Sequence, residues 1–225
     1  MSHLKNSCRL LPMPQSKRPL LIGVTGNIGS GKSAVCKLIA DAGYRVVFAD
    51  VLANQRLEDN VIIESLVNHF GTDILVPDYT DRIDRRKLSV LAFSNEQETT
   101  FLNSVMHPPV LRDMQEIVET ADEEVLFFEV PLLFEASLQV CFDFVILIYV
   151  PADIRIKRLL SLRQNLNCIK ERIASQVDDT NKFSSADLVL DNSGNLDDLN
   201  SAVAQFLSNI INLNKREVSP FTYML

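Results

Sequence analysis

The chain has 225 residues and a net charge of −7, and 47% of its residues are hydrophobic. A chain of this length and composition can bury a core of its own, which excludes a disordered or low-complexity protein. Its negative charge argues against a general nucleic-acid binder. No apolar run approaches the ~20 residues that span a membrane, so we expect neither nucleic acid nor a membrane as a partner.

Residues 1–19 contain a short apolar stretch that Pro12 and Pro14 interrupt. This stretch is too short for a secretion signal, and we expect residues 1–19 to form a disordered extension. The four cysteines lie far apart and include no C-x-x-C pair, which excludes the usual zinc and disulfide patterns. Such cysteine usage fits a reducing compartment and predicts a cytoplasmic protein.

A complete G-x-x-x-x-G-K-S loop follows an apolar run over residues 20–25 and precedes a helical pattern. In this context the glycines let successive N–H groups point at phosphate oxygens, and the helix N-terminus adds partial positive charge. Lys32 can reach the β- and γ-phosphates of a nucleotide, and the Ser33 hydroxyl can hold Mg²⁺. The missing G-x-G opening excludes a dinucleotide fingerprint. The loop residues are Gly26, Asn27, Ile28, Gly29, Ser30, Gly31, Lys32 and Ser33.

Mostly continuous apolar runs, separated by helical patterns, predict strands that are covered on both faces. Helices between successive strands favour a parallel sheet with right-handed crossovers. We therefore expect an α/β fold of three layers around a five-stranded parallel sheet. The strand-like runs cover residues 20–25, 45–49, 125–130, 144–150 and 187–190.

The stretch over residues 51–124 is too long for a single crossover and predicts a mostly helical insertion. Asn95, three residues before Glu98, resembles a capping signal for a helix that runs to Val105. A separate apolar stripe predicts another helix over residues 110–118.

A second excursion over residues 152–184 is rich in Lys and Arg and predicts a basic lid for a polyanionic ligand. A last helix begins at Asn195, with acidic residues in its first turn. Residues 214–225 show no periodic pattern, and we expect a loose tail there. The predicted core therefore consists of residues 20–50, 125–151 and 185–213.

A phosphate loop alone leaves open a kinase, a GTPase or an ATP-driven machine. A GTPase needs an N-K-x-D reader, but residues 181–184 read N-K-F-S, and the D-x-x-G from Asp191 to Gly194 follows that segment instead of preceding it. A further ATPase signature is also missing. These patterns favour a small kinase with one insertion over the acceptor and one over the donor.

Two carboxylates end predicted strands on the side where ligands bind in such sheets. Asp50 can orient an acceptor hydroxyl and take its proton, and Glu129 can contact Mg²⁺ directly or through water. The competing interpretation of Asp50 is N-capping of a helix over residues 51–56, and both roles can coexist. His69 fits a structural position at a helix end better than a catalytic one.

Several motifs in this order resemble the dephospho-coenzyme A kinase family over about residues 20–213. The phosphate loop is similar to the family's T-G-G-I-G-S-G-K-S, and Phe48-Ala49-Asp50 stands at its D-A-D motif. The remaining matches are His69-Phe70-Gly71, Ile83-Asp84-Arg85, Leu102-Asn103, His107-Pro108, the run from Val130 through Pro131, Leu132, Leu133 and Phe134 to Glu135, Arg158, Gln176, Ala186-Asp187 and Asn192.

The resemblance implies ATP-dependent phosphorylation of the ribose 3′-hydroxyl of dephospho-coenzyme A, the last step of coenzyme A synthesis, with Mg²⁺. It implies that Asp50, Lys32 and Arg158 act in catalysis, and that Ala34 and Asn192 join the loop in binding ATP. We further expect a monomer or weak homo-oligomer. The expected metal ligands are Ser33 and Glu129, and the expected acceptor contacts are Asp50, Arg85, His107, Pro131, Leu132 and Glu135.

The chain departs from the family at several positions. Phe48 replaces the first aspartate of D-A-D, so a metal role there is lost or moves elsewhere. Asn54 replaces the usual arginine, so acceptor binding would rely on other cations such as Arg85. Arg163 lies one residue further from Arg158 than in the family. Two alternatives stay open: another small-molecule or nucleoside monophosphate kinase of the same fold, and a nucleotide-binding regulator that lacks transfer activity.

Overall fold

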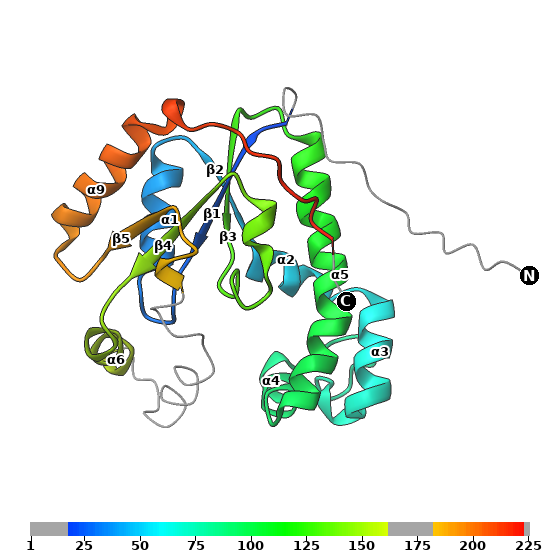
Figure 1. Ribbon diagram of the computed structural model, residues 1–225. Coiled ribbons are helices and arrows are strands. Elements are labelled where there is room, and N and C mark those ends of the chain that lie inside the picture. The colour runs from blue at the N-terminus through cyan, green and yellow to red at the C-terminus, as the bar shows by residue number, and fades with distance from the viewer. Residues whose placement is uncertain (1–17, 162–181, 223–225) are drawn as a thin grey trace, which may run out of the picture.

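One parallel sheet forms the centre of the protein, and the computed structural model describes residues 18–161 and 182–222 (Figure 1). Its five strands run in the order β2-β3-β1-β4-β5. The predicted α/β fold with a five-stranded parallel sheet is confirmed: β1 has the predicted bounds, and the other four strands differ from theirs by one residue at one or both ends. The strands are β1 (Leu20–Thr25), β2 (Arg45–Phe48), β3 (Val125–Glu129), β4 (Phe144–Tyr149) and β5 (Leu188–Asp191).

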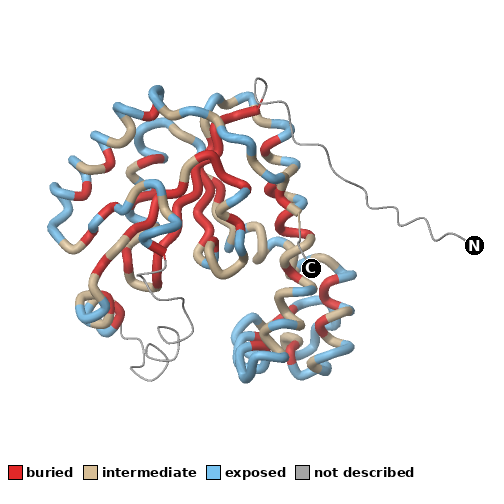
Figure 2. The backbone as a smooth tube through the Cα atoms, viewed as in Figure 1, coloured by how far each residue is buried: buried red, intermediate tan, exposed pale blue. Residues whose placement is uncertain are grey.

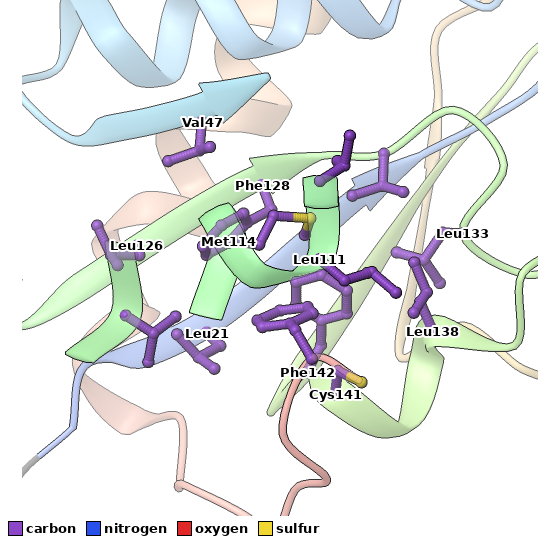
Figure 3. Packing of buried hydrophobic residues seen from close by; sticks show 14 of the residues in the cluster. Leu21, Val47, Leu111, Met114, Leu126, Phe128, Leu133, Leu138, Cys141 and Phe142 are labelled. Carbon is purple, nitrogen blue, oxygen red and sulfur yellow. The ribbon is translucent and has the colours of Figure 1, made fainter. Parts of the chain in front are cut away.

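Helices cover both faces of the sheet, and the strands are its most buried part (Figure 2). One face packs against α1 (Lys32–Asp41) and α9 (Leu196–Ser208). The opposite face packs against the second half of α5 (Glu96–Thr120), where Leu111 and Met114 share a cluster with Phe128 of β3 (Figure 3). Burial on both faces explains why the strands read as continuous apolar runs.

The helices between β2 and β3 form a lobe with its own core (Figures 1 and 2). This core collects apolar residues of α3, α4 and the first half of α5, with Leu66 and Ile74 fully buried. Asp84 caps α4 by accepting hydrogen bonds from the backbone N–H groups of Arg86 and Lys87. The lobe contains α2 (Ala49–Arg56), α3 (Asn60–Phe70), η1 (Thr72–Ile74) and α4 (Arg85–Ala92).

A single helix, α5, replaces the two helices that the sequence predicts over residues 95–105 and 110–118. Asn95 caps it through the backbone N–H of Glu98, as expected. Pro108 and Pro109 lie inside the helix, although proline lacks the N–H that continues a helical ladder. The helix persists because its first half packs in the core of the lobe and its second half packs on the sheet.

The C-terminal segment is held on the core, so the expectation of a loose tail is wrong for residues 214–222; residues 223–225 lie outside the described part. Phe221 is 2% exposed, and its ring centroid lies 5.4 Å from that of Phe128 and 5.3 Å from that of Phe142. The backbone N–H of Arg216 donates to Asp143 at 2.5 Å. The segment lacks helical periodicity because isolated anchors, rather than an apolar stripe, hold it in place.

The same carboxylate anchors the start of the folded chain. Arg18 forms a buried ion pair with Asp143 at 2.5 Å, and the Lys215 ammonium donates to the Arg18 carbonyl. The expected extension over residues 1–19 is therefore too long by Arg18 and Pro19, which are both buried. Residues 1–17 lie outside the described part.

The excursion after β4 begins with α6 (Ala152–Ser161), and most of the predicted lid, including Arg163 and Gln176, lies outside the described residues. The remaining short elements are η2 (Leu138–Cys141) and η3 (Ile210–Asn212). Asn195 begins α9 with a complete capping box, as its sequence predicts. Within residues 18–161 and 182–222, no helix is both long enough and apolar enough to cross a membrane.

Candidate active site

The carboxyl ends of β1, β2 and β3 meet at one edge of the sheet. In the strand register, Glu129 of β3 pairs with Val24 of β1 on one side and with Phe48 of β2 on the other. The phosphate loop begins two residues after Val24, and Asp50 follows Phe48 by two residues. The sheet therefore brings the loop, Asp50 and Glu129 to a common edge, as the strand order predicts.

The phosphate loop has the backbone that an anion site needs. Gly31 has φ +89° at the start of α1, and a Cβ there would collide with the Asn192 amide. Within the described residues, no side chain caps the first turn of α1. The N–H groups of Ala34 and Val35 donate to the Gly31 carbonyl, whereas the N–H groups before them point out of the helix end, where they can donate to a phosphate. The buried Ser30 hydroxyl also finds no hydrogen-bond partner in the described part of the chain.

Lys32 lies over this loop. Its ammonium donates to the Gly26 carbonyl at 2.8 Å and to the Asn27 carbonyl at 3.5 Å. Burial lowers the pKa of Lys32, while the charges of Glu129 and Asp50 raise it. The cation predicted to bind β- and γ-phosphates is therefore close enough to feel both carboxylates.

The two carboxylates have different environments. Glu129 is 6% exposed, and burial raises its pKa, while Lys32 lowers it and Asp50 raises it. Asp50 is exposed and is the second residue of α2, whose N-cap is Phe48. The competing N-capping interpretation of Asp50 is therefore wrong, and the carboxylate faces solvent at the sheet edge.

Ser33 and Glu129 offer a hydroxyl and a carboxylate, which are oxygen donors of the kind that Mg²⁺ prefers. Ser33 is exposed in the first turn of α1, and Glu129 lies at the end of β3. No group of three or more His, Cys, Asp or Glu side chains that could hold a metal occurs within residues 18–161 and 182–222. These donors fit an ion that takes its other ligands from nucleotide phosphates and water.

Asn192 contacts the phosphate loop, and Arg158 contacts Asn192. The Asn192 amide donates to the Ser30 carbonyl at 2.8 Å, and the Arg158 guanidinium donates to the Asn192 carbonyl at 2.8 Å. Asn192 is buried and Arg158 half-buried. Asn192 thus supports the loop, and Arg158 is held next to it from α6.

Apart from Asp50, the predicted acceptor residues lie on α4, on α5 and in the turn after β3. Arg85 of α4 is exposed and donates to the Asn54 carbonyl of α2 at 3.3 Å. His107 is half-buried in α5, where burial lowers its pKa. After β3, Leu132 is 43% exposed, and the Pro131 carbonyl accepts from Thr25 at 3.4 Å.

Comparisons with known proteins identify the family. The family model for dephospho-CoA kinase matches residues 20–198. A dephospho-CoA kinase of Fusobacterium nucleatum is 33% identical over 192 residues, which cover 85% of this chain and 98% of the relative. The chain belongs to the dephospho-CoA kinase family.

Solved structures agree with this assignment. A crystal structure of a Thermus thermophilus protein aligns with a TM-score of 0.75 and 32% identity, covering 86% of this chain and 99% of the other. The dephospho-CoA kinase of Campylobacter jejuni aligns with a TM-score of 0.65 and 26% identity, covering 84% of this chain and 96% of the other.

The departures from the family motifs have structural explanations. Phe48 packs at the margin of the cluster between the sheet and α1, so this position supports the core and supplies no metal ligand. At position 54 the usual arginine is missing, but the Arg85 side chain reaches the Asn54 backbone. A cation is therefore present beside the place where a dephospho-CoA kinase usually carries one.

Two cations of the predicted basic excursion are buried next to the loop, which the sequence did not predict. The Lys182 side chain is fully buried and donates to Asn27 Oδ1 at 2.6 Å and to Glu135 Oε1 at 2.8 Å. Arg155 of α6 is 3% exposed and donates to the Val150 carbonyl at 3.0 Å. In the sequence both belong to a basic excursion, and nothing in the pattern separates an inward-facing cation from a solvated one.

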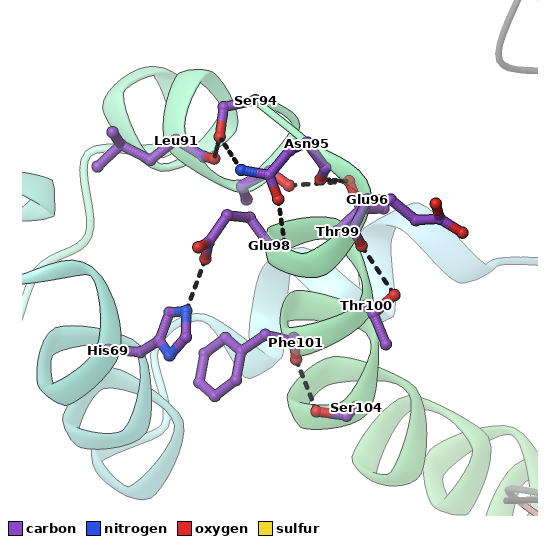
Figure 4. A network of polar contacts seen from close by, with 11 residues as sticks. His69, Leu91, Ser94, Asn95, Glu96, Glu98, Thr99, Thr100, Phe101 and Ser104 are labelled. Carbon is purple, nitrogen blue, oxygen red and sulfur yellow. Dashed lines mark hydrogen bonds and ion pairs between the residues drawn. The ribbon is translucent and has the colours of Figure 1, made fainter.

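His69 lies far from this chemistry, in the lobe of the kinase. Its ring stacks on Phe101 with centroids 3.6 Å apart, and Nε2 lies 2.6 Å from Glu98 Oε2 (Figure 4). These contacts join α3 to α5. The prediction of a structural helix-end residue is confirmed.

Proposed function

We propose that this chain transfers the γ-phosphoryl group of ATP to the ribose 3′-hydroxyl of dephospho-CoA, giving ADP and coenzyme A. Family membership makes the chain a kinase of this class. The observation that carries the proposal is the exposed Asp50 carboxylate at the sheet edge, whose charge acts on both Lys32 and Glu129. Lys32, the cation proposed to bind phosphate, and Asp50, the proposed base, then lie at the same edge of the sheet.

On the donor side, the loop binds the nucleotide through its backbone N–H groups and through Lys32. Ser33 and Glu129 would hold Mg²⁺, which neutralises charge on the β- and γ-phosphate oxygens. Arg158, held beside the loop by Asn192, supplies a further positive charge to the donor. Gly26 through Ala34 make the proposed ATP contacts.

On the acceptor side, Asp50 accepts the proton of the 3′-hydroxyl. The hydroxyl oxygen bonds to the γ-phosphorus as the bond between the γ-phosphorus and the β–γ bridging oxygen breaks. Because Asp50 is exposed, its carboxylate is accessible to an acceptor hydroxyl.

The remaining acceptor contacts are proposed from position and chemistry. Arg85 offers a cation to the acceptor's diphosphate, and the exposed Leu132 and the half-buried Pro131 offer apolar surface. His107 would act as a neutral imidazole, because burial lowers its pKa. Action in the cytoplasm, as a monomer or weak homo-oligomer without a nucleic-acid partner, also stays a prediction.

The test is an assay of the purified chain with MgATP and dephospho-CoA, in which mass spectrometry detects the added phosphate and ³¹P NMR locates it at the 3′ position. Nucleoside monophosphates serve as competing acceptors, and EDTA tests the need for a divalent cation. We expect turnover of dephospho-CoA only when the cation is present. Turnover of a nucleoside monophosphate without turnover of dephospho-CoA would refute the proposal.

A further inference from the structure

Lys182 is a charged side chain in an unusual place. It is among the largest fully buried side chains of the described residues, with 1% of the residue exposed. A lysine almost never reaches this degree of burial unless its charge is paired. Here the ammonium lies between a carboxylate and an amide oxygen, so the cost of burial is offset by two short hydrogen bonds.

The two partners of Lys182 belong to opposite sides of the site. Asn27 is the second residue of the phosphate loop, which holds the donor. Glu135 lies in the turn that begins at Pro131 after β3, on the proposed acceptor side. One ammonium group therefore joins two segments that lie more than one hundred residues apart in the sequence.

The bond to the phosphate loop depends on a residue in which this chain differs from the family motif. The motif T-G-G-I-G-S-G-K-S carries glycine where this chain has Asn27, and glycine has no side-chain oxygen to accept from a lysine. Among the described residues, Asp78 and Ser137 are the non-glycine residues with positive φ, so Asn27 stands there without backbone strain. Its side chain adds a tether that the motif alone lacks.

We propose that Lys182 is a positioning residue for phosphoryl transfer, which ties the phosphate loop through Asn27 to the acceptor-side turn through Glu135. This inference rests on the proposed function and adds to it a link that fixes the spacing between donor and acceptor. Lys182 does not touch the reacting atoms, because its side chain is fully buried. Its charge nevertheless reaches the donor site, where it lowers the pKa of Lys32.

The test combines Asn27→Ala, Lys182→Met and the double variant. A small displacement between reacting groups can cost ~10²-fold in rate, so we expect kcat to fall about 3- to 10-fold in Asn27→Ala and about 10- to 100-fold in Lys182→Met. The double variant should be no slower than Lys182→Met, because both changes cut the same link. The affinity for MgATP should stay within about threefold, since Lys32 and the loop N–H groups are unchanged. The matched control is Lys37→Met, an exposed lysine of α1, which should keep wild-type kcat.

A second readout needs no substrate. Hydrogen exchange of the nucleotide-free protein, followed in peptides that cover residues 20–33, should be faster in Asn27→Ala and in Lys182→Met than in the wild type. If Lys182→Met fails to fold, Asn27→Ala still tests the tether by kcat and by exchange. Additive losses in the double variant, or unchanged exchange in the loop, would overturn the inference. A wild type that makes no coenzyme A would instead refute the proposed function, and the exchange measurement would still decide the tether.

Discussion

Asp50→Asn separates catalysis from stability more clearly than any other substitution in this site. Asp50 is exposed in the first turn of α2 and does not cap the helix. Its interaction with the helix dipole is worth about 0.3–1 kcal/mol, and its attraction to Lys32 is opposed by its repulsion of Glu129. In a domain of this size, that loss lowers Tm by at most about 4 °C.

The expected effect on the rate is much larger. Removal of a general base costs ~10²–10⁴ in kcat, which corresponds to about 3–5 kcal/mol in the barrier. Asparagine keeps the size of the side chain but cannot accept the hydroxyl proton at neutral pH. The loop and Lys32 are unchanged, so the affinity for MgATP should change little.

Steady-state assays with MgATP and dephospho-CoA measure kcat, and thermal melts measure Tm. The matched control is Asp197→Asn, because Asp197 is also an exposed aspartate in the first turn of a helix, α9. It should lose as little stability as Asp50→Asn and keep wild-type kcat. If Asp50→Asn retains kcat within a factor of about three, the carboxylate is not the base and the proposed mechanism is refuted.

Four further predictions concern other parts of the molecule. Lys32→Ala should lower kcat/KM for ATP by ~10²–10³, and an unchanged value would contradict the phosphate-loop assignment. Because burial holds the pKa of His107 below 6.5, the unfolded chain binds the proton more readily than the folded protein does. The free energy of unfolding should therefore fall as the pH drops below 6.5. In urea titrations at pH 7 and pH 5, His107→Gln should flatten this dependence. Phe221→Ala should cost about 3–5 kcal/mol and lower Tm accordingly, whereas an unchanged Tm would mean that the C-terminal segment is not docked. Burial raises the pKa of Cys36 and of Cys141 to about 12, so mass mapping should find both thiols unlabelled by iodoacetamide at pH 8 in the native protein and labelled in guanidinium.

The sheet and the donor site could be predicted because their signals are local. Each strand is a short apolar run, and the loop motif fixes the positions of Lys32 and Ser33 within a few residues. The placement of Asp50 and Glu129 followed from strand order alone, which the register of Phe48 against Glu129 confirms.

The missed features depend on contacts between distant segments. Pro108 and Pro109 read locally as the end of a helix, but packing on both sides keeps α5 continuous. Lys182 reads as one cation in a basic excursion, although its partners Asn27 and Glu135 lie 155 and 47 residues away. No periodicity or motif reports such pairings.

The docked C-terminal segment also has a consequence for synthesis of the protein. Phe221 closes one face of the central sheet against Phe128 and Phe142, and Arg216 reaches back to Asp143 at the start of β4. The strands and α5 leave the ribosome well before residue 221 does. Until then, the nascent chain exposes aromatic surface that attracts chaperones and other unfinished chains. Completion of this core face must therefore wait until the segment around Phe221 has been made.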